Sequence, residues 1–209
     1  MTLVPRIQRS EVLINWIGDR LGGTALPANL RFRLAAGCLD AALEHYRAIV
    51  LLIAHSFHGS AFALVRSMFE AYVRGAWLHQ CASEDQLQLF KRGTLGHSFG
   101  SFLSDLEKLD AFREGVLSSV KKKSWDVMCG FTHTGFDQVV RRNTENDIGP
   151  NYEVDELIEA LDFADGIAIM AGVEFAHLAS DDYLAMAFLE KAKGLAAPVS
   201  INAPDATTI

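Results

Sequence analysis

The sequence contains very little proline, and this scarcity constrains its fold. Only five of the 209 residues are proline, and none lies between Pro27 and Pro150. Because proline is excluded from helix interiors, so long a stretch without it favours long helices. The alternation of polar and apolar residues that marks strands is not sustained anywhere. The sequence therefore predicts an all-α, single-domain helical bundle with long central helices.

Cysteine pairs and long hydrophobic runs are also missing. Cys38, Cys81 and Cys129 are widely spaced and form no Cys-x-x-Cys pair, which favours reduced core thiols over a disulfide framework or a zinc knuckle. The most apolar stretches, residues 48–54 and 166–173, are far shorter than a membrane span. The first residues lack the apolar segment of a secretory signal. We therefore expect a soluble, cytoplasmic protein that does not enter a membrane.

Positive charge is in deficit. The chain has 19 lysine and arginine residues against 26 acidic ones, and its net charge is −7. An acidic surface disfavours non-specific binding to nucleic acids or anionic membranes. The densest basic clusters are residues 121–123 and 141–142. Such runs usually form a solvated face, and a nucleic-acid contact is the alternative.

Apolar periodicity, capping residues and glycines divide the chain into helices. Ser83 followed by Gln86 is a capping box, which predicts a helix start. We expect the bundle to occupy residues 1–193 and residues 194–209 to form a disordered tail. The expected helices cover residues 6–20, 28–55, 58–80, 83–92, 101–112, 122–142 with a break at Gly130 or Gly135, 153–177 and 181–193.

The expected helix over residues 58–80 carries Arg66, Glu70 and Arg74 on one arc. At about 100° per residue, Glu70 and Arg74 lie about 40° and about 80° from Arg66. The helix is otherwise apolar on every side, which indicates a position in the middle of the bundle. Because burying a lone charge is costly, we expect Glu70 to pair with both arginines inside the protein. The arc is either a structural ion network or a polar pocket within the bundle.

Histidines supply further candidates for a site. His55 and His58 are three apart, a spacing that suits a helix-end cap or a metal. No carboxylate motif accompanies them, so we expect neither a metal nor a cofactor. If residues 122–142 are helical, Asp137 lies one turn from His133 and orients its ring. A small-ligand or anion pocket would combine the side chains of Arg66, Glu70, Arg74, His133 and Arg141.

Two sequence blocks resemble known families. Residues 64–71 contain an L-x-R-x-x-x-E-A pattern similar to that of uncharacterised bacterial helical-bundle families, some of them near phage-abortive-infection proteins. The block from Phe131 to Gly135, Phe-Thr-His-Thr-Gly, looks like a second motif of the same kind of family. This resemblance implies an all-helical fold and names no activity.

A further resemblance is to HEPN ribonuclease domains, whose mark is an arginine followed by a histidine after four to six residues. Arg74 and His79 fit that spacing. The resemblance implies a homodimer with RNA as its partner, in which Arg74 and His79 are catalytic and no metal takes part. Three hypotheses thus remain, in order: an unassigned bundle with a structural network, a HEPN-like ribonuclease, and a bundle that binds a small ligand or anion. Whether the protein is an enzyme stays open at this point.

Overall fold

The structure is a computed structural model that describes residues 2–195. No strand occurs within these residues, and one isolated bridge joins Asn143 to Ile148. The helices are α1 (Leu3–Leu21), α2 (Leu30–Ala54), α3 (His58–Gln80), α4 (Glu84–Lys91), α5 (Phe99–Leu106), α6 (Val116–Thr132), α7 (Phe136–Val140), α8 (Val154–Leu178) and α9 (Asp182–Lys193). The expected all-α bundle is confirmed.

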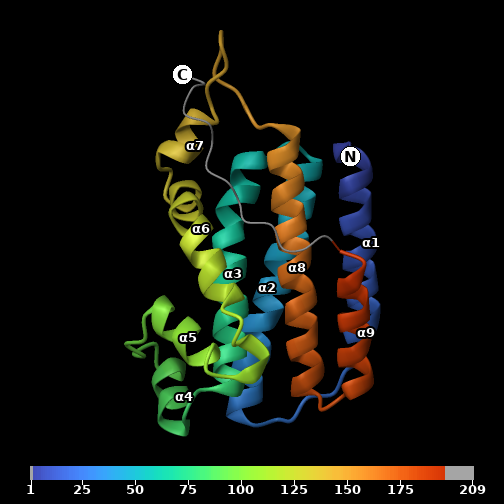
Figure 1. Ribbon diagram of the computed structural model, residues 1–209, viewed down its shortest axis with the longest axis vertical. Helices are drawn as coiled ribbons and strands as arrows, with labels where there is room; N and C mark the ends of the chain where they lie inside the picture. Colours follow the sequence, from blue (N-terminus) through green and yellow to red (C-terminus); the bar gives the residue numbers. More distant parts are fainter. Residues whose placement is uncertain (1, 196–209) are drawn as a thin grey trace.

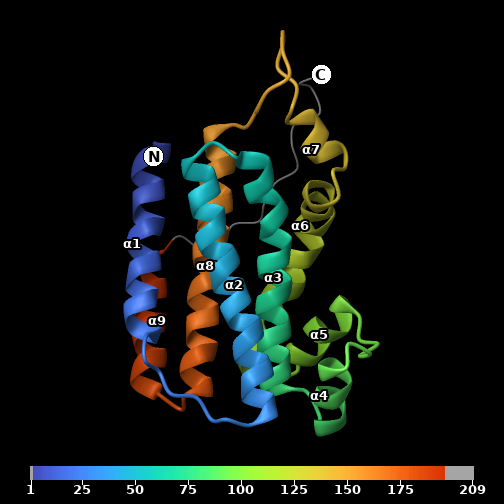
Figure 2. The ribbon, with the colours of Figure 1, turned by 180° about the vertical axis from the view of Figure 1, so that it is seen from behind.

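The long helices α2, α3 and α8 form the centre of the bundle (Figure 1). Helices α1 and α9 line one edge, and α4, α5, α6 and α7 line the other. Figure 2 shows the same order from behind. The start of α3 and helix α7 lie at one end of the bundle, whereas α4 and α5 lie near the other end. Side chains that meet at each end therefore come from helices far apart in the sequence.

Helix α3 is central because it packs against α2, α8, α5 and α6. Gly75 allows the close approach of α2, since a Cβ at this position would lie 2.8 Å from the Leu39 side chain. Phe69, Tyr72 and Trp77 are almost completely buried on different sides of α3. Each large apolar side chain buried in this way contributes about 1.5–3 kcal/mol. The all-round apolar pattern thus predicted the position of α3 correctly.

Several helix boundaries agree with the sequence-based expectation. Helix α3 covers residues 58–80 as expected, and the capping box between Ser83 and Gln86 opens α4. The expected single helix over residues 101–112 was wrong, because α5 ends at Leu106 and a short 3-10 helix, Asp110–Phe112, follows it. These residues bend the chain from α5 toward α6.

The start of α6 also differs from the expectation. This helix begins at Val116 rather than near residue 122, because Gly115 adopts a left-handed conformation (φ 68°) directly before it. The expected break is present between Thr132 and Phe136, where Gly135 precedes α7. Thr134 takes a left-handed conformation (φ 54°) there, which interrupts the helix between α6 and α7.

Within residues 2–195, no helix is long and apolar enough to cross a membrane. Gly194 and Leu195 follow α9 in the structure. The rest of the expected disordered tail, residues 196–209, lies outside the described residues.

Candidate functional site

Four polar side chains meet where α3 faces α6, and we call them the Arg66–His133 cluster: Arg66, Glu70, Arg74 and His133. Arg66 Nε donates to Glu70 Oε1 at 2.8 Å, and Arg74 Nη2 donates to Glu70 Oε2 at 2.7 Å. Glu70 therefore holds one arginine on each side at i, i+4 spacing, as expected from the helical arc. Since two guanidinium groups share one carboxylate, the arc keeps a net positive charge.

Arg66 connects this arc to α6. Its Nη1 lies 2.9 Å from His133 Nε2 and 3.3 Å from Cys129 Sγ. Its guanidinium carbon lies 4.5 Å from the centre of the Trp125 ring, a cation–π distance. A guanidinium only donates, so His133 Nε2 accepts and the imidazole proton of the neutral ring is on Nδ1. One arginine thus orients a histidine, a thiol and an indole on the neighbouring helix.

The cluster is only half-buried, and this corrects the expectation of an interior network. The side chains of Arg66, Glu70 and Arg74 are 21%, 15% and 36% exposed. The reason is that their arc faces the edge of α6, while the apolar residues of α3 face α2 and α8. Arg74 also approaches α2, where its charge partly offsets the burial that raises the pKa of the Cys38 thiol to about 11. Solvent can therefore reach the positive groups.

His133 occupies a helix end rather than a helix interior. It caps the C-terminus of α6, so the expected helical pairing of His133 with Asp137 is wrong. Asp137 instead packs on Gly130, where a Cβ would lie 3.1 Å from the Asp137 Cβ. This tight turn from α6 into α7 directs His133 toward Arg66. The Phe-Thr-His-Thr-Gly block therefore has a clear structural role.

Arg141 makes a different contact from the rest of the expected pocket. It follows α7, is almost completely buried, and binds Glu156 in the first turn of α8. No hydrogen bond or ion pair within residues 2–195 joins Arg141 to the Arg66–His133 cluster. The structure thus joins Arg66, Glu70, Arg74 and His133, and it places Arg141 at the end of the bundle.

His79 lies near the opposite end of α3 and contacts α8. Its Nδ1 is 3.2 Å from Glu174 Oε2, and Gln80 Nε2 donates to the same carboxylate. Glu174 is only 3% exposed, and the sequence-based interpretation missed its role. At about 100° per residue, His79 lies about 140° around α3 from Arg74, so the two side chains leave the helix in different directions.

A second ionic network joins α1, α2 and α8, and sequence reasoning missed it entirely. Arg6 donates to Asp162, Asp165 and Ser10 at 2.7–3.0 Å, and Tyr46 Oη donates to Asp165 at 2.7 Å. Burial raises the pKa of Asp165, and Arg6 opposes that shift. Asp165 and Glu174 flank the most apolar stretch of α8, which was the only signal available. The sequence could not predict their partners, because Arg6 and Asp165 are 159 positions apart.

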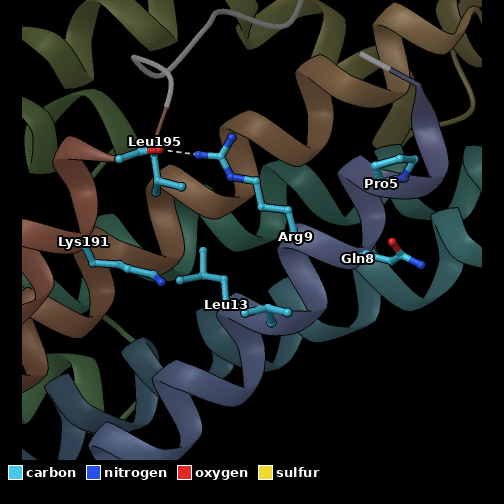
Figure 3. Close-up of a pocket in the computed structure, with 8 residues that line it drawn as sticks. Pro5, Gln8, Arg9, Leu13, Lys191 and Leu195 are labelled. Atoms are coloured by element: carbon cyan, nitrogen blue, oxygen red, sulfur yellow. Dashed lines mark hydrogen bonds between the residues drawn. The ribbon is translucent and has the colours of Figure 1, made fainter.

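Several hollows lie in the surface of the described part of the chain. Figure 3 shows one of about 450 Å³ between α1 and α9, lined by Pro5, Arg9 and Lys191 among others. Arg9 already donates to the carbonyl oxygen of Gly194 there. This pocket adjoins Leu195, the last described residue, so no site is assigned to it. Among residues 2–195, no group of histidine, cysteine and acidic side chains is arranged to hold a metal ion.

The fold and this geometry define a helical-bundle protein with a half-exposed ionic site on its central helix. Residues 39–197 match the family described as "Family of unknown function (DUF6988)", which is more than half of the chain. The chain therefore belongs to that family, whose description assigns no activity. No curated protein and no solved structure matches the chain. The Arg66–His133 cluster lies within the matched residues, whereas Arg6 and Ser10 of the buried network lie before them.

Proposed function

We propose that the chain binds a small anion, carrying a phosphate or carboxylate group, at the Arg66–His133 cluster. The observation that carries this proposal is the contact of Arg66 with His133 across α3 and α6. This contact brings residues 64–71 together with the Phe-Thr-His-Thr-Gly block, at a position that solvent reaches. Buried salt bridges that only stabilise a fold do not need such access.

The unused donors of the cluster support the same function. Within residues 2–195, Nε and Nη1 of Arg74 make no hydrogen bond, and only its Nη2 is committed to Glu70. Lys121 lies 5.7 Å from the Trp125 ring and adds a further positive charge beside Arg66. Guanidinium groups bind phosphate and carboxylate through paired, charge-assisted hydrogen bonds. A surplus of cations in a chain of net charge −7 makes this face the favoured one for an anion.

The test is a titration with inorganic phosphate, followed through the indole N–H signal of Trp125 by NMR. We expect a saturable shift, and we expect Arg66→Ala and Arg74→Ala each to weaken binding by about tenfold. The matched control is Arg113→Ala, because Arg113 is an exposed arginine that, among residues 2–195, pairs with the exposed Asp110. An affinity unchanged in Arg66→Ala, or lost equally in Arg113→Ala, rules out the cluster as the binding site.

A HEPN-like ribonuclease is the second candidate function. The observation in its favour is that the buried Glu174 carboxylate binds His79 Nδ1 and orients the ring. A histidine oriented in this way has its other nitrogen available for proton transfer. Arg74 points in a different direction from His79, so this proposal requires a homodimer that brings Arg74 of one chain near His79 of the other.

The ribonuclease proposal has a direct test. Incubation of the purified chain with single-stranded RNA in EDTA should give cleavage that Arg74→Ala and His79→Ala abolish without unfolding the protein. Light scattering of the same samples should show a dimer. Intact RNA at high protein concentration, or a monomer that cleaves as well as the dimer, would count against this function.

We also infer a bacterial origin, from the resemblance of residues 64–71 to bacterial helical-bundle families, and a cytoplasmic location. All three cysteines are free thiols in the structure, which fits a reducing compartment. Fractionation of cells that express the full chain tests the location, and recovery in the periplasm or medium would disprove it.

A further inference from the structure

Helix α9 packs against the bundle with one side only. Phe188 is completely buried on that side, and Gly172 in α8 leaves the room that its ring occupies. The Trp16 ring of α1 lies edge-on to the Phe188 ring, with ring centres 5.0 Å apart. Figures 1 and 2 show α9 beside α1 and α8 at one edge of the bundle. The opposite side of α9 therefore points away from the bundle in a fixed direction.

The opposite side of α9 is apolar where a surface helix is normally polar. Tyr183, Met186 and Leu189 lie on it and are 90%, 67% and 53% exposed. At about 100° per residue, Met186 lies about 160° around the helix from the buried Phe188. A single exposed apolar residue needs no explanation, whereas several on one helix face mark an interaction surface. We call this side of the helix, with Tyr183, Met186 and Leu189, the outer α9 face.

The outer α9 face has the residue spacing of a coiled-coil seam. The residues of this seam follow one another at i, i+4, i+7 and i+11, and they are Asp182, Met186, Leu189 and Lys193. With this repeat, side chains of one helix insert between those of a second helix. The centre of the seam is apolar, its first position is acidic and its last position is basic. It therefore fits a helix with an apolar centre and the reverse order of charges.

A second copy of α9 meets this requirement when the two helices run antiparallel. In the register that sets Met186 opposite the partner's Leu189, Asp182 lies opposite the partner's Lys193. The reason is that four positions toward the start of one helix correspond to four positions toward the end of the other. The two-fold symmetry of such a pair makes each contact twice. Opposite charges then attract at both ends, whereas parallel helices would set like charges against each other.

The existing contacts of the two charged residues do not oppose this pairing. Lys193 Nζ donates to Glu190 Oε2 at 2.5 Å, and both side chains are mostly exposed. Exposed pairs of this kind contribute little to stability, so Lys193 can exchange its partner at little cost. At the start of α9, Asp181 rather than Asp182 accepts the capping hydrogen bond from Leu184 N–H. Both charged ends of the seam can therefore bind a partner helix.

We propose that the outer α9 face forms a homodimer, in which α9 packs antiparallel against α9 of a second copy. The seam spans about 18 Å of helix, so we expect a small interface and a reversible dimer. Helices α9 and α6 line opposite edges of the bundle (Figures 1 and 2). The pairing therefore leaves the Arg66–His133 cluster open and does not depend on anion binding. It is also a different dimer from that of the ribonuclease candidate, because it does not bring Arg74 near the partner's His79.

The experiment is sedimentation equilibrium of the full chain over a range of concentrations. We expect a monomer–dimer equilibrium, and a dissociation constant about tenfold higher in Met186→Glu, because this change places a charge in the apolar centre of the seam. The matched control is Leu51→Glu, since Leu51 is 60% exposed in the last turn of α2, and this variant should associate like the unmodified chain. A chain that stays monomeric at millimolar concentration overturns the proposal and leaves the outer α9 face to residues 196–209 or to another protein. A dimer that Met186→Glu does not weaken, or that Leu51→Glu weakens equally, overturns it as well.

An exchange of charges tests the antiparallel register. Asp182→Lys and Lys193→Glu should each weaken the dimer by about threefold or more, because each sets like charges opposite each other. The double variant should recover most of the affinity, since the exchanged charges attract again across the pair. Circular dichroism of all variants at low concentration checks that each monomer keeps its helical fold. A folded double variant that dimerises no better than the single variants overturns the antiparallel pairing of α9.

Discussion

The protein contains two ionic networks with opposite charge balance and opposite surroundings. Around Asp165, an arginine and two hydroxyls are sealed between α1, α2 and α8, with Arg6 2% and Asp165 1% exposed, and Asp162 binds the same arginine from a more exposed position. In the Arg66–His133 cluster, two arginines share one carboxylate beside a histidine, and these groups lie at the edge of α6 and remain open to solvent. The first network satisfies its charges internally, whereas the second keeps a positive surplus and unused donors.

This difference teaches that charge type alone does not distinguish a structural network from a binding site. Removing one partner from a sealed network leaves an uncompensated buried charge, which is strongly destabilising. When one member of a half-exposed ion pair at i, i+4 spacing is removed, water replaces it at little cost in stability. Stability measurements should therefore respond mainly to the first network, and ligand affinity mainly to the second.

The largest effect is expected from Asp165→Ala. This change leaves the guanidinium of Arg6 buried with a weakened partner set, and it should lower the free energy of unfolding by about 3–5 kcal/mol in urea denaturation. Asp162→Ala is the matched control, because Asp162 also binds Arg6 but is 20% exposed, so its loss should be smaller. Equal losses in both variants would remove the distinction between sealed and open carboxylates.

A smaller effect is expected from Gly130→Ala, which tests the turn that positions His133. The added methyl group would collide with Asp137 and should cost about 1–3 kcal/mol, as over-packing does. The His133 ring signals should shift in the same variant. Gly37→Ala is the control within α2, since its methyl group meets nothing within 4 Å and should stabilise the helix by up to about 1 kcal/mol. If Gly130→Ala behaves like Gly37→Ala, the turn is not tightly packed.

Above about pH 10, the free energy of unfolding should depend on pH because Tyr46 belongs to the sealed network. Burial, followed by the charge of Asp165, raises the pKa of Tyr46 well above its ordinary value. The unfolded chain therefore loses this proton first, and stability falls as pH rises above the ordinary tyrosine pKa. Each such tyrosine contributes a slope of about 1.4 kcal/mol per pH unit. In Tyr46→Phe, the free energy of unfolding should therefore fall less steeply with rising pH than in the unmodified protein. Parallel plots of this free energy against pH for the two proteins would contradict a sealed Tyr46.

The smallest effect on stability is expected from Glu70→Ala. Its two pairs are half-exposed, so the free energy of unfolding should fall by less than about 1 kcal/mol. Thermal melts of Glu70→Ala and Glu70→Gln, compared with Asp165→Ala, measure this directly. A loss as large as that of Asp165→Ala would show that the Arg66–His133 cluster is a structural support after all.

Local features of the fold were predictable from the sequence. The proline-free stretch and the apolar periodicity predicted the all-α bundle, and the pattern around Arg66 predicted a central helix. The pairing of Glu70 with Arg66 and Arg74 was also predictable, because residues four apart meet on any helix. The expected pairing of His133 with Asp137 failed, because the glycines predicted a break in the helix but not the close Gly130–Gly135 contact that accompanies it and ends α6 before His133.

The sequence by itself therefore determined the helices and the arc of charges on α3, because both follow from a periodicity of a few residues. Only the tertiary structure decided what those charges face. The meeting of Arg66 with His133 and the sealing of Arg6 against Asp165 both join distant segments. Such contacts depend on which helix faces pack together, and many arrangements satisfy the same apolar pattern.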